Sequence, residues 1–298
     1  RRGSATLNWR SKMRFGTGFA LTAMDDTVAV RDFAQALDGA GFDFVTTAGH
    51  LLCVEPGRFP DRPAATYVGP FYDPFVLFSY LAAVTERIAF RTSILILPLF
   101  PTALVAKQAA ELSLFSSGRF QLGVGISWNE PEYQTLNQDI HTRGRRLAEQ
   151  ITVLRKLWTE PLVTFQGRWH TLDGVGLNRL PKAPIPLWMG TGADAGERVL
   201  RRVARLADGW TPLGDPTEAM PRLRQYLTEA GRDASTFRVA ARVLAGPDGP
   251  AAWVAEAKRL KGVGVTDIAI GAPPDMPPSQ AMARLIEARR VLADDIGG

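Results

Sequence analysis

Two hydrophobic patterns alternate along the whole chain. Short apolar runs typical of strands are separated by longer runs in which apolar residues recur at the spacing of a helix. The strand-type runs cover residues 13–20, 42–47, 88–97, 119–126, 185–190, 209–212, 237–244 and 265–270. The helix-type runs cover residues 27–41, 74–86, 102–115, 139–158, 193–206, 217–230, 251–260 and 279–293. The repeated alternation of strand and helix predicts an α/β protein.

Eight strand–helix units without a break in composition favour a closed (β/α)₈ TIM barrel over an open, doubly wound sheet. The run 88–97 is almost continuously apolar, which suits a strand that is buried on both faces. The irregular connections 50–73 and 159–184, the second with a hairpin at 163–172, predict insertions at the C-terminal rim of the barrel. We expect one domain over 13–298 and a disordered arm over 1–12.

Composition excludes several classes of function. The 298 residues include 46% hydrophobic and 22% charged residues, and the net charge is +5. The excess arginines are spread over helical segments and form no basic stripe with interleaved aromatic residues, so nucleic-acid binding is not indicated. No apolar run is long enough to span a membrane. The single cysteine, Cys53, and three histidines without ligand spacing predict neither a disulfide nor a metal site, and a cytoplasmic location is expected.

The ends of the predicted strands carry the candidate site, because TIM barrels place their chemistry at the C-terminal rim. The segment Gly190-Thr191-Gly192-Ala193 follows a strand and is predicted to open a helix. Glycines allow close backbone approach, and the N–H groups of a helix N-terminus favour a phosphate. A tight turn without a ligand explains the segment equally well. The dinucleotide fingerprint is absent after the first strand.

The fourth strand ends in Gly123-Val124-Gly125, followed by Ser127 and Trp128. Small residues at the rim leave space for a flat ring, and Trp128 could form a wall of the pocket. The alternative is that the two glycines relieve crowding inside the barrel.

His50 is the only histidine at a strand end. Imidazole titrates near neutral pH and is suited to proton transfer, although a structural role for His50 is the alternative. The carboxylates Glu130 and Glu132 lie in a predicted loop and are expected to be solvated. No Gly-x-Ser-x-Gly nucleophile elbow is present.

Four segments carry a family resemblance that extends from the first strand to the last. They are TSILILPLFPTALVAKQAAELSLFSSGRFQLGVGISWNEPEYQTL, RGRRLAEQITVLRKLWTEPLVTFQGRWH, PIPLWMGTGADAGERVLRRVARLADGW and GVTDIAI. In order and spacing the chain resembles the luciferase-like flavin and deazaflavin oxidoreductases, and most of all the branch that depends on coenzyme F420.

The resemblance implies roles for several residues. Ser93 and Ile94 match the position where relatives hold a non-prolyl cis peptide against the middle ring of the cofactor. Gly190, Thr191 and Gly192 match the phosphate site of the family. The remaining candidates for contact with the cofactor are Gly49, Ser127 and Ala193.

The resemblance also contains departures. His50 matches the histidine of an Asp–His pair in the deazaflavin-dependent sugar-phosphate dehydrogenases, but Gly49 stands where that aspartate would be. Trp128 stands where those enzymes keep an acidic residue, and both differences argue against sugar-phosphate dehydrogenation. We therefore take His50 and Trp128 as the candidate catalytic residues for another substrate.

Three functions follow from these observations. The first is hydride transfer between F420 and a small organic substrate. The second is an FMN-dependent monooxygenase that uses oxygen and reduced flavin from a separate reductase. The third is a non-catalytic flavin-binding partner subunit, favoured by the missing acids at positions 49 and 128. The resemblance also implies a homodimer, because relatives pair through early helices. The run 74–86 agrees with this, since Phe75, Phe78, Tyr80 and Leu81 give it more aromatic and apolar surface than one helix face needs.

Overall fold

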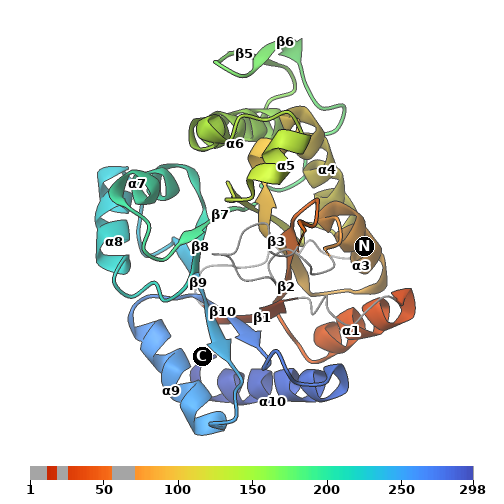
Figure 1. Cartoon of the computed structure of the whole chain (residues 1–298), viewed down its shortest axis with the longest axis vertical. Helices are drawn as coiled ribbons and strands as arrows, with labels where there is room; N and C mark the ends of the chain where they lie inside the picture. Colours follow the sequence, from red (N-terminus) through yellow and green to blue (C-terminus); the bar gives the residue numbers. More distant parts are fainter. Residues whose placement is uncertain (1–11, 19–25, 56–70, 298) are drawn as a thin grey trace.

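The computed structural model describes residues 12–18, 26–55 and 71–297. Eight parallel strands form a closed barrel in the order β1-β10-β9-β8-β7-β4-β3-β2, which confirms the predicted TIM barrel (Figure 1). The strands are β1 (Arg14–Gly18), β2 (Phe44–Gly49), β3 (Ala89–Ile96), β4 (Phe120–Gly125), β7 (Leu187–Gly192), β8 (Gly209–Leu213), β9 (Arg238–Leu244) and β10 (Asp267–Gly271). Residues 19–20 of the first predicted strand lie outside the described residues.

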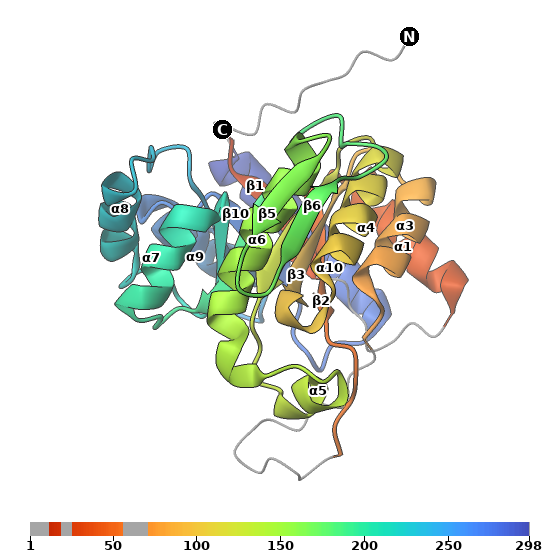
Figure 2. The ribbon, with the colours of Figure 1, turned by 90° about the horizontal axis from the view of Figure 1, so that it is seen from above.

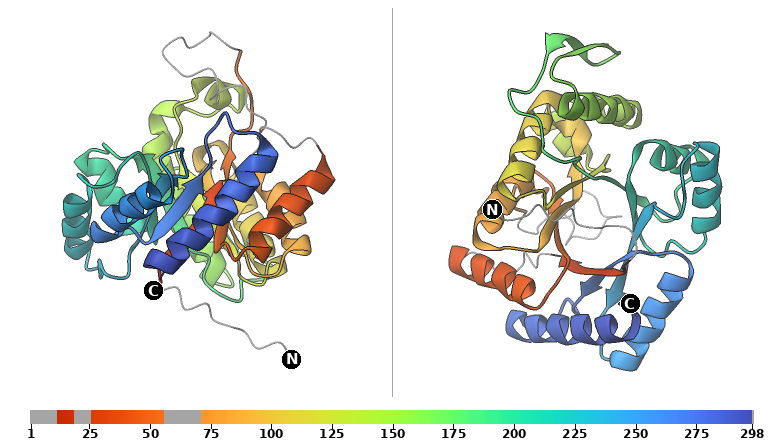
Figure 3. Two further views of the ribbon diagram at one scale, coloured as in Figure 1. Left: turned by 90° about the horizontal axis from the view of Figure 1, so that it is seen from below. Right: turned by 180° about the vertical axis from the view of Figure 1, so that it is seen from behind.

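Helices surround the barrel on its outside (Figure 1). They are α1 (Thr27–Gly39), α3 (Pro74–Val84), α4 (Thr102–Phe115), α6 (Arg143–Thr159), α7 (Glu197–Leu206), α8 (Met220–Glu229), α9 (Pro250–Gly262) and α10 (Pro278–Ile296). The last helix, α10, closes the ring between α9 and α1 (Figure 3), where the Arg289 guanidinium donates to the Gly41 carbonyl at 2.7 Å.

The long connection between β4 and β7 departs from a plain strand–helix unit. It contains the short helix α5 (Glu130–Thr135), the 3₁₀ turn η3 (Ile140–Thr142), helix α6 and the predicted hairpin, which forms from β5 (Val163–Gln166) and β6 (Thr171–Val175). Figure 2 shows α5 at the end of the barrel opposite the C-terminal end of α10, with the hairpin alongside α6. The sequence pattern did not predict α5, because six residues are too few for a helical period.

Large side chains fill the interior of the barrel near the amino ends of the strands. Arg91, Trp188 and Phe44 are each at most 2% exposed. The Arg91 guanidinium lies 3.6 Å from the Trp188 ring centroid and 4.1 Å from that of Phe44, and it donates to Asp267 at 2.8 Å. Burial lowers the pKa of Arg91 to about 10, against the opposing effect of Asp267. A buried cation is tolerated here because the carboxylate pairs with it.

The aromatic residues of helix α3 do not form the exposed surface that was expected for a dimer contact. Its aromatic residues Phe75 and Phe78 are 5% and 0% exposed, because they pack into the layer between the helix and the barrel. They are therefore unavailable for a dimer contact. The exposed apolar residues of this helix are Val76 and Tyr80, at 72% and 39%.

Candidate functional site

A cavity of about 1020 Å³ opens at the carboxyl ends of the barrel strands. Its position confirms the prediction that the site lies at this rim. Most of the sequence-predicted site residues line it: His50, Ser93, Ile94, Ser127, Trp128, Gly190, Thr191 and Gly192. Two others do not. Gly49 lies behind the wall, where an added methyl would stand 3.2 Å from the Ile94 carbonyl oxygen, and Ala193 lies beyond the end of β7.

Strand β3 is irregular where it meets the cavity. The peptide bond between Ser93 and Ile94 is cis, as the family resemblance predicted. The pairing of β3 with β4 shifts register between Arg91 and Leu95. As a result, the side chain of Ile94 lies on the cavity wall instead of continuing the regular alternation of the strand.

The glycines beside β3 make room for it. A methyl group on Gly125 would lie 2.7 Å from Ile94 Cδ1, and one on Gly190 would lie 2.5 Å from Ile94 Cγ2. A methyl on Gly123 would collide with the Thr92 carbonyl oxygen at 1.9 Å. Relief of crowding, one of the two explanations for Gly123 and Gly125, is therefore confirmed. Gly125 and Gly190 pack against one side of Ile94, and the other side of Ile94 borders the cavity.

The Gly-Thr-Gly-Ala segment differs from its prediction. It does not open a helix, because β7 continues through Gly192 and α7 begins only at Glu197. The Ala193 N–H donates to the Leu213 carbonyl at 3.0 Å, which ties the segment to β8. The Thr191 hydroxyl accepts from Trp210 Nε1 at 2.8 Å. The backbone at Gly190 and Gly192 still borders the cavity, but a helix N-terminus does not point into it from this segment.

His50 and Glu132 form a pair at the rim. His50 Nδ1 lies 2.9 Å from Glu132 Oε2, and the side chains are 18% and 0% exposed. The Leu51 N–H donates to Glu132 Oε1 at 2.6 Å, and Asn129 Nδ2 donates to Glu132 Oε2 at 2.8 Å. The expectation that Glu132 is solvated is therefore wrong: α5 folds back over the rim and buries this carboxylate, whereas Glu130 is exposed as expected.

The charge of Glu132 determines the tautomer of His50. Burial alone would raise the pKa of Glu132, but the hydrogen bonds from His50 and from the Leu51 and Leu52 N–H groups outweigh it and lower the pKa. A carboxylate only accepts hydrogen bonds, so His50 Nδ1 carries the proton. In the neutral ring Nε2 is then the basic nitrogen, and the ring borders the cavity.

Aromatic rings hold the imidazole in place. The centroid of Phe71 lies 5.1 Å from that of His50, and the centroid of Trp128 lies 6.4 Å away, both in tilted geometry. Trp128 thus forms a wall of the pocket, as predicted. Its indole has no acid–base group that titrates near neutral pH, so of the two candidate catalytic residues only His50 has a side chain suited to proton transfer.

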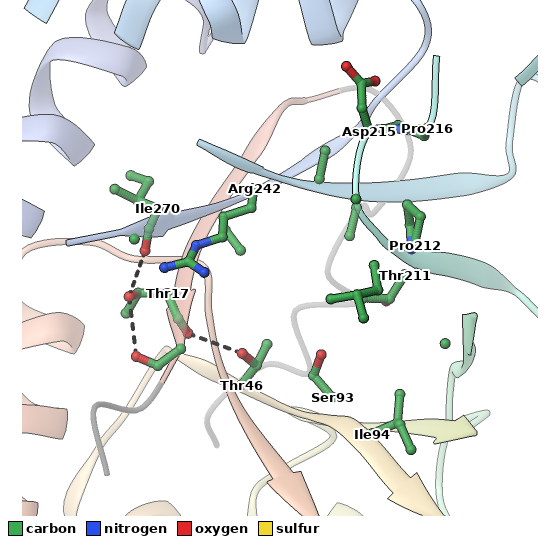
Figure 4. Close-up of a pocket in the computed structure, with 18 of the residues that line it drawn as sticks. Thr17, Thr46, Ser93, Ile94, Thr211, Pro212, Asp215, Pro216, Arg242 and Ile270 are labelled. Carbon is green, nitrogen blue, oxygen red and sulfur yellow. Dashed lines mark hydrogen bonds between the residues drawn. The ribbon is translucent and has the colours of Figure 1, made fainter. Parts of the chain in front are cut away.

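Sequence reasoning missed a polar part of the cavity wall. It is formed by Thr17, Thr46, Thr211 and Arg242, which project toward the cavity from β1, β2, β8 and β9 (Figure 4). The Thr17 hydroxyl donates to the Ile270 carbonyl at 2.8 Å, so it is fixed by the neighbouring strand. Arg242 could have been found: in β9 the alternation places Arg238, Ala240 and Arg242 on one face of the strand.

A second His–Glu pair lies away from the cavity. His170 Nδ1 lies 2.8 Å from Glu149 Oε1, and His170 Nε2 lies 2.6 Å from the Thr102 hydroxyl. Both ring nitrogens are therefore occupied, and the pair joins the β5–β6 hairpin to α6 and α4. This explains why His170 is not a candidate for catalysis.

The described part of the chain contains neither a cluster of metal-ligand side chains nor a membrane-spanning helix. No three His, Cys, Asp or Glu side chains gather there as metal ligands would. Among the described helices none is long and apolar enough to cross a membrane.

A closed barrel with its cavity at the carboxyl ends of the strands has the architecture of a TIM-barrel enzyme. The sequence profile of the luciferase-like monooxygenase family matches residues 11–285, and the chain belongs to this family. An uncharacterised protein of Mycobacterium tuberculosis is 34% identical over 300 residues, which cover 94% of this chain and 99% of that protein.

Solved structures share the fold at low sequence identity. An F420-dependent secondary alcohol dehydrogenase in complex with an F420–acetone adduct has a TM-score of 0.78 at 17% identity, covering 95% of this chain and 99% of that one. Riboflavin lyase with modified FMN and riboflavin has a TM-score of 0.79 at 15% identity, covering 97% and 93%. At these identities the likeness establishes the barrel fold.

Proposed function

We propose that this protein is an F420-dependent oxidoreductase that moves a hydride between the deazaflavin and a small organic substrate. The observation that carries the proposal is the His50–Glu132 pair at the edge of the cavity. Hydride transfer to or from a carbon bearing oxygen requires a proton to leave or reach that oxygen. A neutral imidazole with its basic nitrogen at the cavity can perform this transfer.

The cavity fits a flat tricyclic cofactor. Ile94 stands out from the wall at the cis peptide, and Gly125 and Gly190 leave the space beside it free of side chains. Ser127 and Thr191 border the same region. When bound there, the deazaflavin would supply the hydride donor or acceptor, as cofactors carry such chemistry in general. The backbone at Gly190–Gly192 would hold its phosphate by close approach.

The side chains then divide the work. His50 Nε2 holds or accepts the proton of the substrate oxygen, and Glu132 stabilises the imidazolium that forms when the ring accepts a proton. Phe71 and Trp128 keep the ring oriented and exclude water from one side of it. Glu132 also supplies the acidic partner that is missing at positions 49 and 128, which removes the reason for expecting a non-catalytic subunit.

The second candidate is an FMN-dependent monooxygenase. It is supported by the likeness to riboflavin lyase with modified FMN and by the same ring-sized cavity. That reaction would draw oxygen and reduced flavin from outside the protein, the latter from a separate reductase. It gives the His50–Glu132 pair no obvious part, which is why we place it second.

Cofactor binding and turnover test the proposal together. Purified protein is titrated with F420 and with FMN, and bound F420 is then assayed with alcohols and carbonyl compounds. We expect micromolar binding of F420, and His50→Ala to lower turnover by ~10²–10⁴-fold with little change in cofactor affinity. Exposed His141, changed to Ala, is the matched control. Binding of FMN alone, with oxygen uptake in the presence of reduced FMN, would replace the first candidate by the second.

We also propose a homodimer that contacts its partner through the exposed apolar residues of α1 and α3, Val28, Val76 and Tyr80. A monomer mass by light scattering at micromolar concentration would refute it.

A further inference from the structure

Arg242 is one of two arginines that border the cavity. It lies on β9, its side chain is exposed, and it borders the cavity together with Ala240 on the same face of the strand. In the barrel order β3-β4-β7-β8-β9, four steps separate β9 from β3. In a ring of eight strands that places Arg242 on the wall opposite Ile94, as Figure 4 shows.

The neighbouring strand is shaped around this guanidinium. A methyl group on Gly271 of β10 would lie 2.6 Å from both Nε and an Nη atom of Arg242. Only a glycine at this position lets the side chain lie flat across β10. The Arg242 guanidinium therefore lies against Gly271, where β10 carries no side chain.

No acidic side chain of the described residues pairs with Arg242. The other cavity arginine, Arg259, is different: it donates to Asp215 at 2.7 Å and to Glu256 at 2.6 Å, and both acids also border the cavity. The Arg259 guanidinium is thus already paired with two carboxylates. When a ligand displaces water from the cavity, an unmatched guanidinium loses hydration and needs an anion in return.

We propose that Arg242 binds a carboxylate group of the organic substrate, so that the substrates of this protein are organic acids. The pose of the substrate rests on the proposed function: a ring supported by Ile94 turns its other face toward Arg242. The planar guanidinium matches a carboxylate in a two-point contact. A phosphate dianion is disfavoured relative to a carboxylate, because its second negative charge has no cation to pair with and increases the repulsion from Asp215 and Glu256.

The alternative is that Arg242 binds an anionic group of the cofactor. An experiment can distinguish an anion of the substrate from an anion of the cofactor. F420 is compared with its deazaflavin riboside, which lacks the phosphate and the glutamate tail. If Arg242 serves the substrate, Arg242→Gln leaves the affinity ratio of these two compounds unchanged. A loss confined to F420 would assign Arg242 to the cofactor and overturn the proposal.

The direct test is titration calorimetry with benzoate, its neutral analogue benzamide and phenyl phosphate, with and without cofactor. We expect benzoate to bind ~10–100-fold more tightly than benzamide. Arg242→Gln should abolish this preference, Arg242→Lys should keep part of it, and Gly271→Ala should weaken it by displacing the guanidinium. Arg205→Gln, an equal charge change on the exposed face of α7, should leave it intact. Thermal unfolding confirms that each variant is folded.

Equal binding of benzoate and benzamide would refute the proposal, and tighter binding of phenyl phosphate would refute the carboxylate class. Because the titrations without cofactor need neither F420 nor turnover, they succeed or fail independently of the proposed function. Failure of F420 to bind, with the benzoate preference intact, would count against the proposed function alone.

Discussion

The two ends of the barrel interior are built from the same strands but serve different purposes. On four of the strands, an inward position near the amino end is large or charged, and the inward position two residues further along is small or carries a hydroxyl. The pairs are Phe44 and Thr46 on β2, Arg91 and Ser93 on β3, Trp188 and Gly190 on β7, and Asp267 and Ala269 on β10. One step of the strand alternation thus separates a filled core from an open cavity of about 1020 Å³.

Charges follow the same division. At the filled end Asp267 is fully buried and accepts from Arg91 and Arg238, each at 2.8 Å. Burial alone would raise the pKa of Asp267, but Arg91, Arg238 and Arg14 together lower it. At the open end Arg242 lacks an acidic partner among the described residues, and His50, paired with Glu132, borders the cavity. Matched charges stabilise a barrel, whereas unmatched ones are available for a ligand.

The largest expected effect lies at the filled end. Asp267→Ala would leave Arg91 buried without its carboxylate, and we expect the free energy of unfolding to fall by about 3–5 kcal/mol. Denaturant unfolding measures this. Glu111→Gln, which breaks an exposed pair with Lys107 on α4, is the control and should cost less than about 1 kcal/mol. Similar losses in the two variants would show that the buried network does not hold the barrel together.

A pair of glycine variants compares the two ends directly. A methyl on Gly209 would lie 2.6 Å from the enclosed ring of Trp188, whereas a methyl on Gly190 would lie 2.5 Å from Ile94, which borders open space. We expect Gly209→Ala to lower the free energy of unfolding by about 1–3 kcal/mol and Gly190→Ala to lower it less, since Ile94 can turn into the cavity.

The affinity for the cofactor should change in the opposite order. We expect Gly190→Ala to lower it more than Gly209→Ala does. Thermal melts and cofactor titrations on the same preparations provide both measurements. If Gly190→Ala proved the more destabilising of the two, the open end would be as tightly packed as the filled one.

The smallest effect concerns the pH dependence that Glu132 gives to stability. Its pKa is lowered in the folded protein, so its ionisation stabilises the fold fully above the pKa of an unfolded glutamate. This contribution is lost as the pH falls through the lower, folded pKa. We expect Glu132→Gln to lower the free energy of unfolding by about 1–2 kcal/mol at pH 7, with the difference shrinking toward pH 4.

Unfolding curves at several pH values check this, and Glu130→Gln, an exposed neighbour, is the control. A difference between Glu132→Gln and the native protein that stayed constant from pH 7 down to a pH below the folded pKa of Glu132 would mean that the charge of Glu132 contributes nothing to stability.

The pattern of apolar residues was enough to predict the barrel, because strand and helix periods are local properties of the chain. The place of the site followed from the ends of those strands, and the cis bond between Ser93 and Ile94 followed from the family resemblance. Even Arg242 could have been predicted from the alternation along β9. The strand and helix periods and the alternation along β9 depend on residues that are close in sequence, whereas the cis bond was inferred from the family.

Only the tertiary structure decided the partner of His50 and the start of α7. Glu132 lies 82 residues from His50, and no local pattern distinguishes it from the exposed Glu130; it becomes a buried carboxylate because α5 folds over the rim. Likewise, the Ala193 N–H bonds to Leu213 on the neighbouring strand and draws the segment away from a helix. Contacts between distant segments set the charge, burial and direction of these groups, and the sequence around each residue contains no record of them.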